Sequence, residues 1–266
     1  MVNFLGWYMS MLHKTVKLSG MQPKAVEIEP GTVVNFWVPS KPSEKPKPIL
    51  VLVHGFAADG ILTWQFQVLS SSLRKKYDLY VPDLLFFGGS YTSRGERSTR
   101  FQADCIAAGL RRLGVERCIV VGFSYGGFVG FQMAQHHSDL VGSMVVSGST
   151  LALTQSISSK ALERLGFASW SELLLPTSAQ GVKVLVEHGS YKLHKLIPRY
   201  LCKDFLEVMF SNRKERMELL EALVVRDEDV TNCQFQQRIH LLWGSEDKIL
   251  DMKVANSLKE KLGDRK

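Results

Sequence analysis

The chain has 266 residues, of which 45% are hydrophobic and 22% are charged. This balance is typical of a globular protein that buries one large core, and it excludes disorder as the default interpretation. The net charge of +7 is spread along the sequence without a basic block, so the charge does not indicate a nucleic-acid partner.

The four cysteines show none of the spacings that are typical of metal sites. One of them begins an apolar run, where a buried thiol behaves as a small hydrophobic group. We therefore expect a reducing compartment and a cytoplasmic location, with no metal and no cofactor. The cysteines are Cys105, Cys118, Cys202 and Cys233.

Residues 1–13 place their apolar side chains at helical spacing. The segment is too short to span a bilayer, and no positive charge precedes its apolar part as it would in a signal peptide. We expect a helix that docks on the body of the protein or on the helical insert described below. The alternative is a helix that lies on a membrane surface and makes the protein membrane-associated.

A hairpin follows this N-terminal segment. Two strand-like runs, "KAVEIE" and "TVVNFWV", flank a turn at Pro30 and Gly31. The stretch "PSKPSEKPKP" (residues 39–48) then predicts an exposed loop, because so many prolines can hold neither a strand nor a helix.

From Ile49 the chain alternates apolar runs with segments of helical periodicity. That order predicts parallel strands joined by right-handed crossovers, hence an α/β fold with a doubly wound, mostly parallel sheet. The predicted strands are 49–54, 77–83, 117–123 and 140–149, and the predicted helices are 62–76, 101–114 and 125–137.

Residues 151–231 interrupt the alternation with amphipathic helical segments and no strand between them. One of these helices starts at a capping-box pattern, Ser169 with Glu172. An insert at this point can cover a pocket at the carboxyl ends of the strands, so we interpret it as a lid. The sheet pattern then returns with a strand in 237–247 and a helix over 251–262.

The chain therefore divides into four parts. They are an N-terminal helical segment with the start of the hairpin (1–31), an α/β core (32–150), the helical lid (151–231) and the continuation of the core (232–266).

The motif "GFSYG", Gly122 to Gly126, lies between an apolar strand and a helix, and Gly127 follows it. In a G-x-S-x-G motif the turn from strand to helix is so sharp that the serine takes a strained backbone, and the glycines prevent collisions. We predict that Ser124 is a nucleophile held at the positive end of the helix. The alternative is a serine that only satisfies a tight turn.

A second turn ends the strand at 49–54, at His54 and Gly55. Such a turn would let the backbone N–H of Phe56 point toward Ser124. Acyl transfer needs two donors where the oxyanion develops, and the N–H of Tyr125 would be the other.

These motifs, with "VPDLLFFGGS" and "LLWGSEDKI", resemble the α/β-hydrolase family in its lid-bearing lipase, esterase and epoxide-hydrolase branch. The motif sequences are most similar to those of plant members. The resemblance implies that Asp247, in a G-x-x-D pattern from Gly244, is the acid of a serine, acid and histidine triad. The alternative is that Asp247 caps the next helix, although Asp251 is better placed for that. We interpret Asp83 as a residue that organises its loop.

The residue at the elbow separates the activities within the family. Epoxide hydrolases attack with an aspartate there, whereas position 124 is a serine. The resemblance therefore implies hydrolysis of an ester, a thioester or a carbon–carbon bond. We expect Tyr191 and Tyr200 to pack the lid rather than to activate an epoxide.

The family's histidine follows the acid in chain order, but no histidine follows Asp247. We therefore expect a C-terminally truncated product in which the last strand and helix are missing. The alternative is a fold that has moved its base. The histidines are His13, His54, His136, His137, His188, His194 and His240.

The expected function is that of a serine hydrolase of carboxylic esters, such as monoacylglycerols or other lipid esters, working through an acyl-enzyme. For lack of the triad histidine, we expect this chain to be impaired. The alternative is a non-catalytic ligand-binding or interaction protein on the same fold.

Overall fold

A computed structural model describes residues 3–43, 45–192, 195, 197–230 and 234–263. At its N-terminal end lies helix α1 (Phe4–Leu18), which is followed by strands β1 (Met21–Glu29) and β2 (Thr32–Pro39). The two strands pair antiparallel around Gly31, whose positive φ of 82° suits the tight turn. The predicted hairpin is therefore confirmed.

The sheet is doubly wound and mostly parallel, as predicted. Its strand order is β1-β2-β4-β3-β6-β7-β10, with the short β5 (Tyr91–Thr92) paired to β2. From β4 to β10 every neighbouring pair is parallel. The remaining strands are β3 (Ile49–Val53), β4 (Asp78–Pro82), β6 (Cys118–Phe123), β7 (Val141–Ser147) and β10 (Arg238–Leu241).

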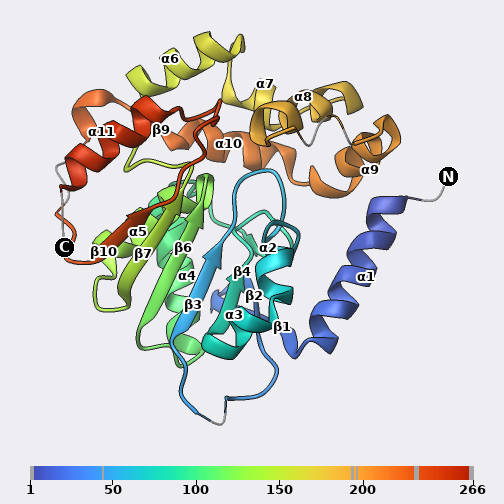
Figure 1. Cartoon of the computed structure of the whole chain (residues 1–266), viewed down its shortest axis with the longest axis vertical. Coiled ribbons are helices and arrows are strands. Elements are labelled where there is room, and N and C mark those ends of the chain that lie inside the picture. Colours follow the sequence, from blue (N-terminus) through green and yellow to red (C-terminus); the bar gives the residue numbers. More distant parts are fainter. Residues whose placement is uncertain (1–2, 44, 193–194, 196, 231–233, 264–266) are drawn as a thin grey trace.

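Helices flank the sheet on both sides (Figure 1). Helices α4 and α5 pack against each other, and α5 covers β6 and β7. Where one helix was expected over 62–76, the structure has two, because Ser70 adopts an extended backbone and its hydroxyl caps the second one. The helices are α2 (Gly60–Leu69), α3 (Ser71–Lys76), α4 (Thr99–Arg112) and α5 (Tyr125–His136).

A helical insert runs between β7 and β10 and lies over the carboxyl ends of the strands (Figure 1). The expectation that it holds no strand is wrong, because β8 and β9 form a short parallel pair at its two ends. The sequence patterns also did not predict α9. The elements of the insert are β8 (Leu153–Thr154), α6 (Gln155–Leu165), α7 (Trp170–Leu174), α8 (Ala179–Gly189), α9 (Arg199–Met209), α10 (Arg213–Leu223) and β9 (Val224–Val225).

The capping box expected at α7 forms only in part. The Ser169 hydroxyl accepts the N–H of Glu172 at 3.2 Å, as predicted. The Glu172 carboxylate, however, accepts the N–H of Ala168 at 2.8 Å rather than that of Ser169. Both bonds still satisfy donors at the start of the helix.

Helix α1 docks on both the core and the insert, which agrees with the expected docked helix. It contacts α9, α2 and β1, and it buries Met9, Leu12 and Val16 on its inner face. The helix continues five residues beyond the predicted segment, to Leu18. Within the part of the chain that the structure describes, no helix combines the length and the apolar character that crossing a membrane would require.

Candidate active site

Ser124 is the single residue between β6 and α5. Its backbone has φ +52° and ψ −122°, a conformation that residues other than glycine rarely adopt. The N–H of Ser124 donates to the carbonyl of Ser147 on β7 at 2.9 Å, and its own carbonyl accepts from Gly127 at 2.8 Å. The hydroxyl makes no capping bond to α5, so it remains available at the positive end of that helix.

The glycines of the motif are required by close approach of the backbone. A Cβ on Gly122 would lie 2.6 Å from the carbonyl oxygen of Gly126. A Cβ on Gly126 would lie 2.4 Å from the carbonyl oxygens of Val53 and His54. Gly127 is equally crowded, because its Cβ would lie 2.4 Å from the Cβ of Ser149. Any larger residue would push α5 away from the sheet.

The turn after β3 lies beside Ser124. A Cβ on Gly55 would be 3.2 Å from the Cβ of Ser124, and the rings of Phe56 and Tyr125 pack edge to face at 5.7 Å. Neither the Phe56 N–H nor the Tyr125 N–H donates a hydrogen bond to any residue that the structure describes. The two predicted oxyanion donors are thus both unpaired and close to the serine.

His54 is fully buried with both ring nitrogens in use. Its Nε2 accepts the N–H of Leu84 at 2.9 Å, so Nδ1 carries the proton and donates to the carbonyl of Gly55 at 2.7 Å. Burial lowers the pKa of His54 to about 4. His54 therefore shapes the turn and has no free lone pair with which to take a proton from Ser124.

Asp247 lies in the loop between β10 and helix α11 (Met252–Leu262). Its Oδ1 accepts the N–H groups of Ile249 and Leu250 at 2.9 and 3.0 Å. Its Oδ2 lies next to Gly148, since a Cβ added to Gly148 would be 3.4 Å from that oxygen. Because Gly148 follows Ser147, the carboxylate is at the same end of the sheet as Ser124.

The two alternatives for Asp247 can be compared directly. The N-cap of α11 is Asp251, whose Oδ1 accepts from Lys253 and Val254. Asp247 is therefore not the cap, and its Oδ2 accepts no hydrogen bond from the described residues. Partial burial raises the pKa of Asp247, although the two N–H groups oppose this shift.

No histidine among the described residues hydrogen-bonds to Ser124 or Asp247. His13 packs against Trp37, His137 bonds to Asp104, and His188 bonds to the carbonyl of Val184. His136 ends α5, and His240 is exposed on β10. His194 lies outside the described residues.

Asp83 organises its loop, as predicted. One carboxylate oxygen accepts the N–H of Gly60 at 3.0 Å. The other accepts the Asn35 amide at 2.8 Å and the N–H of Gly89 at 3.0 Å. Burial raises the pKa of Asp83, so these donors hold a carboxylate that would otherwise be costly to keep charged.

Arg216 of α10 is a buried residue that the sequence did not single out. It donates from Nε to the carbonyl of Phe86 at 3.0 Å and from Nη1 to the carbonyl of Met209. Its guanidinium lies 4.0 Å from the ring of Phe87, which packs on both His54 and Phe56. Phe86 has a positive φ of 72°, so the insert holds a strained core loop next to the candidate oxyanion turn.

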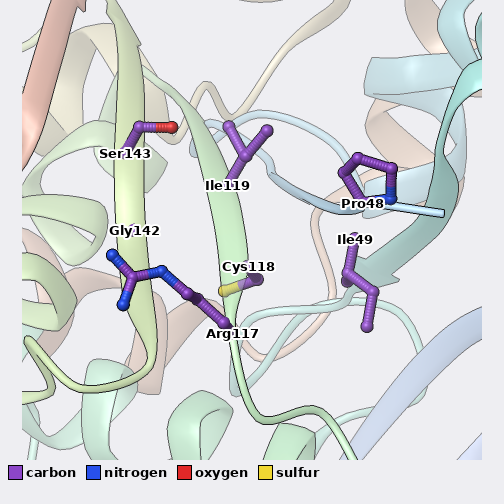
Figure 2. Close-up of a pocket in the computed structure, with 7 residues that line it drawn as sticks. All are labelled: Pro48, Ile49, Arg117, Cys118, Ile119, Gly142 and Ser143. Carbon is purple, nitrogen blue, oxygen red and sulfur yellow. The ribbon is translucent and has the colours of Figure 1, made fainter. Parts of the chain in front are cut away.

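Two grooves of the described surface lie away from these residues. One of about 350 Å³ opens at the amino ends of β3, β6 and β7, opposite to Ser124, and Figure 2 shows Arg117 lying over Gly142 there. Another, of about 440 Å³, lies between α7 and α10. Neither is lined by a predicted site residue.

Comparison with solved structures shows the same fold. The structure of a membrane phospholipase A, described as a bacterial virulence factor, matches with a TM-score of 0.73 at 21% identity, covering 97% of this chain and 80% of that one. The structure of 2-hydroxy-6-oxo-6-phenylhexa-2,4-dienoate hydrolase from Rhodococcus matches with a TM-score of 0.68 at 18% identity, covering 91% and 87%.

Curated relatives match over a shorter stretch. Pimeloyl-[acyl-carrier protein] methyl ester esterase of Vibrio atlanticus is 36% identical over 103 residues, which is 39% of this chain and 37% of the relative. Epoxide hydrolase 3 of Xenopus tropicalis is 29% identical over 107 residues, 39% of this chain and 28% of the relative. The aligned part thus spans about a third of the length of these relatives.

A family model described as the alpha/beta hydrolase fold matches residues 48–266. This match spans the strand that precedes the His54 turn, the Ser124 elbow, the insert and the Asp247 loop. The chain belongs to the α/β-hydrolase family.

Proposed function

We propose that the chain is a serine hydrolase of carboxylic esters in which Ser124 is the nucleophile. The observation that carries the proposal is the turn at Ser124. The turn strains the backbone of Ser124, and the hydroxyl makes no capping bond to α5. The N–H groups of Phe56 and Tyr125, which donate to none of the described residues, belong to the same turns. A turn that served stability alone would have no reason to keep these groups free.

The chemistry follows from those groups. The Ser124 oxygen attacks the carbonyl carbon of the ester, and the N–H groups of Phe56 and Tyr125 hold the oxyanion that forms. Each such donor lowers the barrier by about 3 kcal/mol. The bond to the alcohol then breaks, the alcohol leaves with a proton, and water releases the acid from the acyl-enzyme.

Asp247 is proposed as the acid that orients a histidine, since its Oδ2 accepts no hydrogen bond from the described residues. None of the described histidines reaches Ser124 or Asp247, and His54 is locked in its turn. A serine without a base is a poor nucleophile. We therefore expect slow turnover by this chain.

The elbow residue favours esters over epoxides. The relatives include an esterase and epoxide hydrolases by name. The family resemblance implies an aspartate at the elbow of an epoxide hydrolase, whereas this chain has Ser124 there. The apolar inner faces of the insert and the likeness to a phospholipase favour an ester with an apolar acyl chain, such as a monoacylglycerol or another lipid ester. We interpret the insert as the lid over that substrate.

The proposed location is cytoplasmic, since the three described cysteines are free and buried. Contact with a membrane surface is a separate proposal, because it depends on α1 rather than on Ser124.

A fluorophosphonate probe tests the nucleophile. We expect it to label wild type and the control Ser143→Ala, a serine at the far end of β7, and not to label Ser124→Ala. Slow hydrolysis of p-nitrophenyl butyrate should be lost in the same variant. Rapid hydrolysis that survives Ser124→Ala would contradict the proposal.

A second candidate function is non-catalytic ligand binding on the same fold. The locked tautomer of His54 and the absence of a described histidine at Ser124 favour it. If the folded chain does not react with the fluorophosphonate at all, this second function replaces the first.

A further inference from the structure

Helix α1 is apolar on two opposite faces. The inner face packs on the protein through Met9, Leu12 and Val16. The outer face carries a second apolar stripe, although a surface helix of a globular protein normally places polar residues there. The residues of this outer stripe, all exposed, are Phe4, Trp7, Tyr8, Met11 and Leu18.

Two helices that contact α1 each carry a further exposed aromatic side chain. The ring of Phe4 packs edge to face on Tyr200 of α9 at 5.6 Å. The hydroxyl of Tyr8 bonds to Gln65 of α2, and the next residue, Phe66, is 78% exposed. Figure 1 shows α1 at the margin of the molecule with its N-terminal end near α9. We call the outer stripe with Phe66 and Tyr200 the aromatic surface.

The composition of this surface favours a lipid partner. Trp and Tyr rings, apolar with one polar atom, are enriched where a membrane meets water. A soluble protein rarely leaves so many large apolar side chains together without a partner.

The charges around the aromatic surface have the sign that an anionic bilayer attracts. Helix α1 contains no acidic residue and carries Lys14 and Lys17, both exposed. Arg199 and Lys203 lie on α9, the helix that α1 contacts. Of the nearby acids, Asp204 is buried and accepts the N–H groups at the start of α1, and Glu207 pairs with Lys203 at 3.9 Å. Asp59, near His13, accepts the N–H of Leu62 at the start of α2. An excess of positive charge therefore faces outward.

We propose that the aromatic surface docks on an anionic lipid bilayer. Helix α1 then lies in the plane of the interface, with its inner face held by the protein and its outer stripe in the headgroup region. Docking does not require the chemistry of Ser124, so it stands apart from the proposed hydrolase activity. It would bring the insert, through α9, next to the lipid.

The experiment is co-flotation of the full chain with vesicles of phosphatidylcholine and phosphatidylserine in equal parts, compared with pure phosphatidylcholine. We expect binding to the anionic vesicles that weakens as salt is added. The double variant Trp7→Ser/Met11→Ser should bind at least about tenfold less, since each buried CH₂ is worth about fourfold in partitioning.

The matched control is Leu242→Ser/Met252→Ser, which removes two exposed apolar side chains, one directly after β10 at the opposite edge of the sheet and one at the start of α11. It should bind as wild type does. A charge variant, Lys14→Gln/Lys17→Gln, should lose about fivefold for each lysine on anionic vesicles. This variant tests the proposal independently if the Trp7 variant folds poorly, which circular dichroism would reveal.

Equal flotation of wild type and both α1 variants would overturn the proposal. So would a dimer in light scattering that Trp7→Ser/Met11→Ser dissociates while no form binds lipid, because the surface would then join two copies of the chain. Fluorophosphonate labelling of Ser124 in the same samples reports on the hydrolase separately.

Discussion

Ser124 stores strain in its backbone, at the position where the fold leaves its hydroxyl free. A non-glycine residue in such a conformation costs on the order of 1–3 kcal/mol, and the surrounding structure must supply that energy. Here β7 supplies part of it through the bond from Ser124 to the Ser147 carbonyl, and the crowded glycines fix the rest of the path. The strain belongs to the backbone and does not depend on the hydroxyl.

Ser124→Gly should therefore be more stable than Ser124→Ala by about 1 kcal/mol in free energy of unfolding, because glycine adopts the positive φ without strain. Urea unfolding at equilibrium measures the difference. The control is Ser98→Ala, which removes the cap of α4 and should cost about 1 kcal/mol. A glycine variant less stable than the alanine variant would show that the turn is not strained.

His54 should make the stability of the fold depend on pH. Its folded-state pKa of about 4 lies below the unfolded value of 6.5, so the unfolded chain binds the extra proton between these values. The stabilising contribution is complete above pH 6.5 and is lost as pH falls toward 4. From pH 7 to pH 5 we expect wild type to lose about 2 kcal/mol from this residue.

The measurement is urea unfolding of wild type and His54→Asn at both pH values. The stability gap between them should narrow by that amount at the lower pH, since the variant has no imidazole to protonate. Burial also raises the pKa of Asp83, which acts on stability in the opposite sense. A gap that does not change with pH would contradict the neutral, buried imidazole.

The sequence predicted the residues whose roles follow from local geometry. The Ser124 elbow, the loop-organising Asp83 and the cap at Asp251 each depend on a turn or helix end that a short motif encodes. Arg216 could not be found in this way, because "RKERMELLEAL" has an ordinary polar face. Its burial depends on Phe86 and Phe87, far away in the chain.

At the scale of elements, α10 is bonded to the loop that follows β4. Arg216→Met should lower the free energy of unfolding by about 2 kcal/mol, because the Phe86 and Met209 carbonyls lose a charged donor. Urea unfolding measures the change in the free energy of unfolding. The control is Lys214→Met, at an exposed position on the same helix, which should stay within about 0.5 kcal/mol of wild type. Equal stability of the two variants would mean that the carbonyls find other donors.

The prediction of secondary structure was wrong where an element is shorter than the sequence pattern needed to detect it. Strands β8 and β9 have two residues each, too few to show any periodicity, and they exist only because they meet each other. The break at Ser70 is a single extended residue inside a run that is otherwise helical. Long runs such as β6 and α5 were found because they repeat their pattern over several turns or pleats.

At the scale of the whole molecule, the sheet is unevenly protected. Strands β3 and β6 lie in its centre with neighbours on both sides, whereas β10 pairs, within the described ranges, with β7 alone. Arg238 and His240 of β10 are also exposed. Stability is therefore expected to fall from the centre of the sheet toward β10.

Amide hydrogen exchange should show this gradient directly. We expect the amides of β10 to open with a free energy at least about 2 kcal/mol below that of β6, because a strand with one neighbour can detach without disrupting the core. The amides of β3 serve as the internal reference for full protection. Equal protection of β6 and β10 would show that the sheet opens only as one unit.

The carbonyl of Phe86 belongs to the core, yet the described side chains that donate to it belong to the insert. They are Asn212, the N-cap residue of α10, and Arg216 within α10. The insert therefore cannot be exchanged for that of another protein without affecting the core. A chimera that took its insert from another hydrolase would strip this carbonyl of its donors, unless the graft brought an asparagine and an arginine to the same two positions. Swapping specificity between relatives would thus mean transplanting this pair along with the pocket.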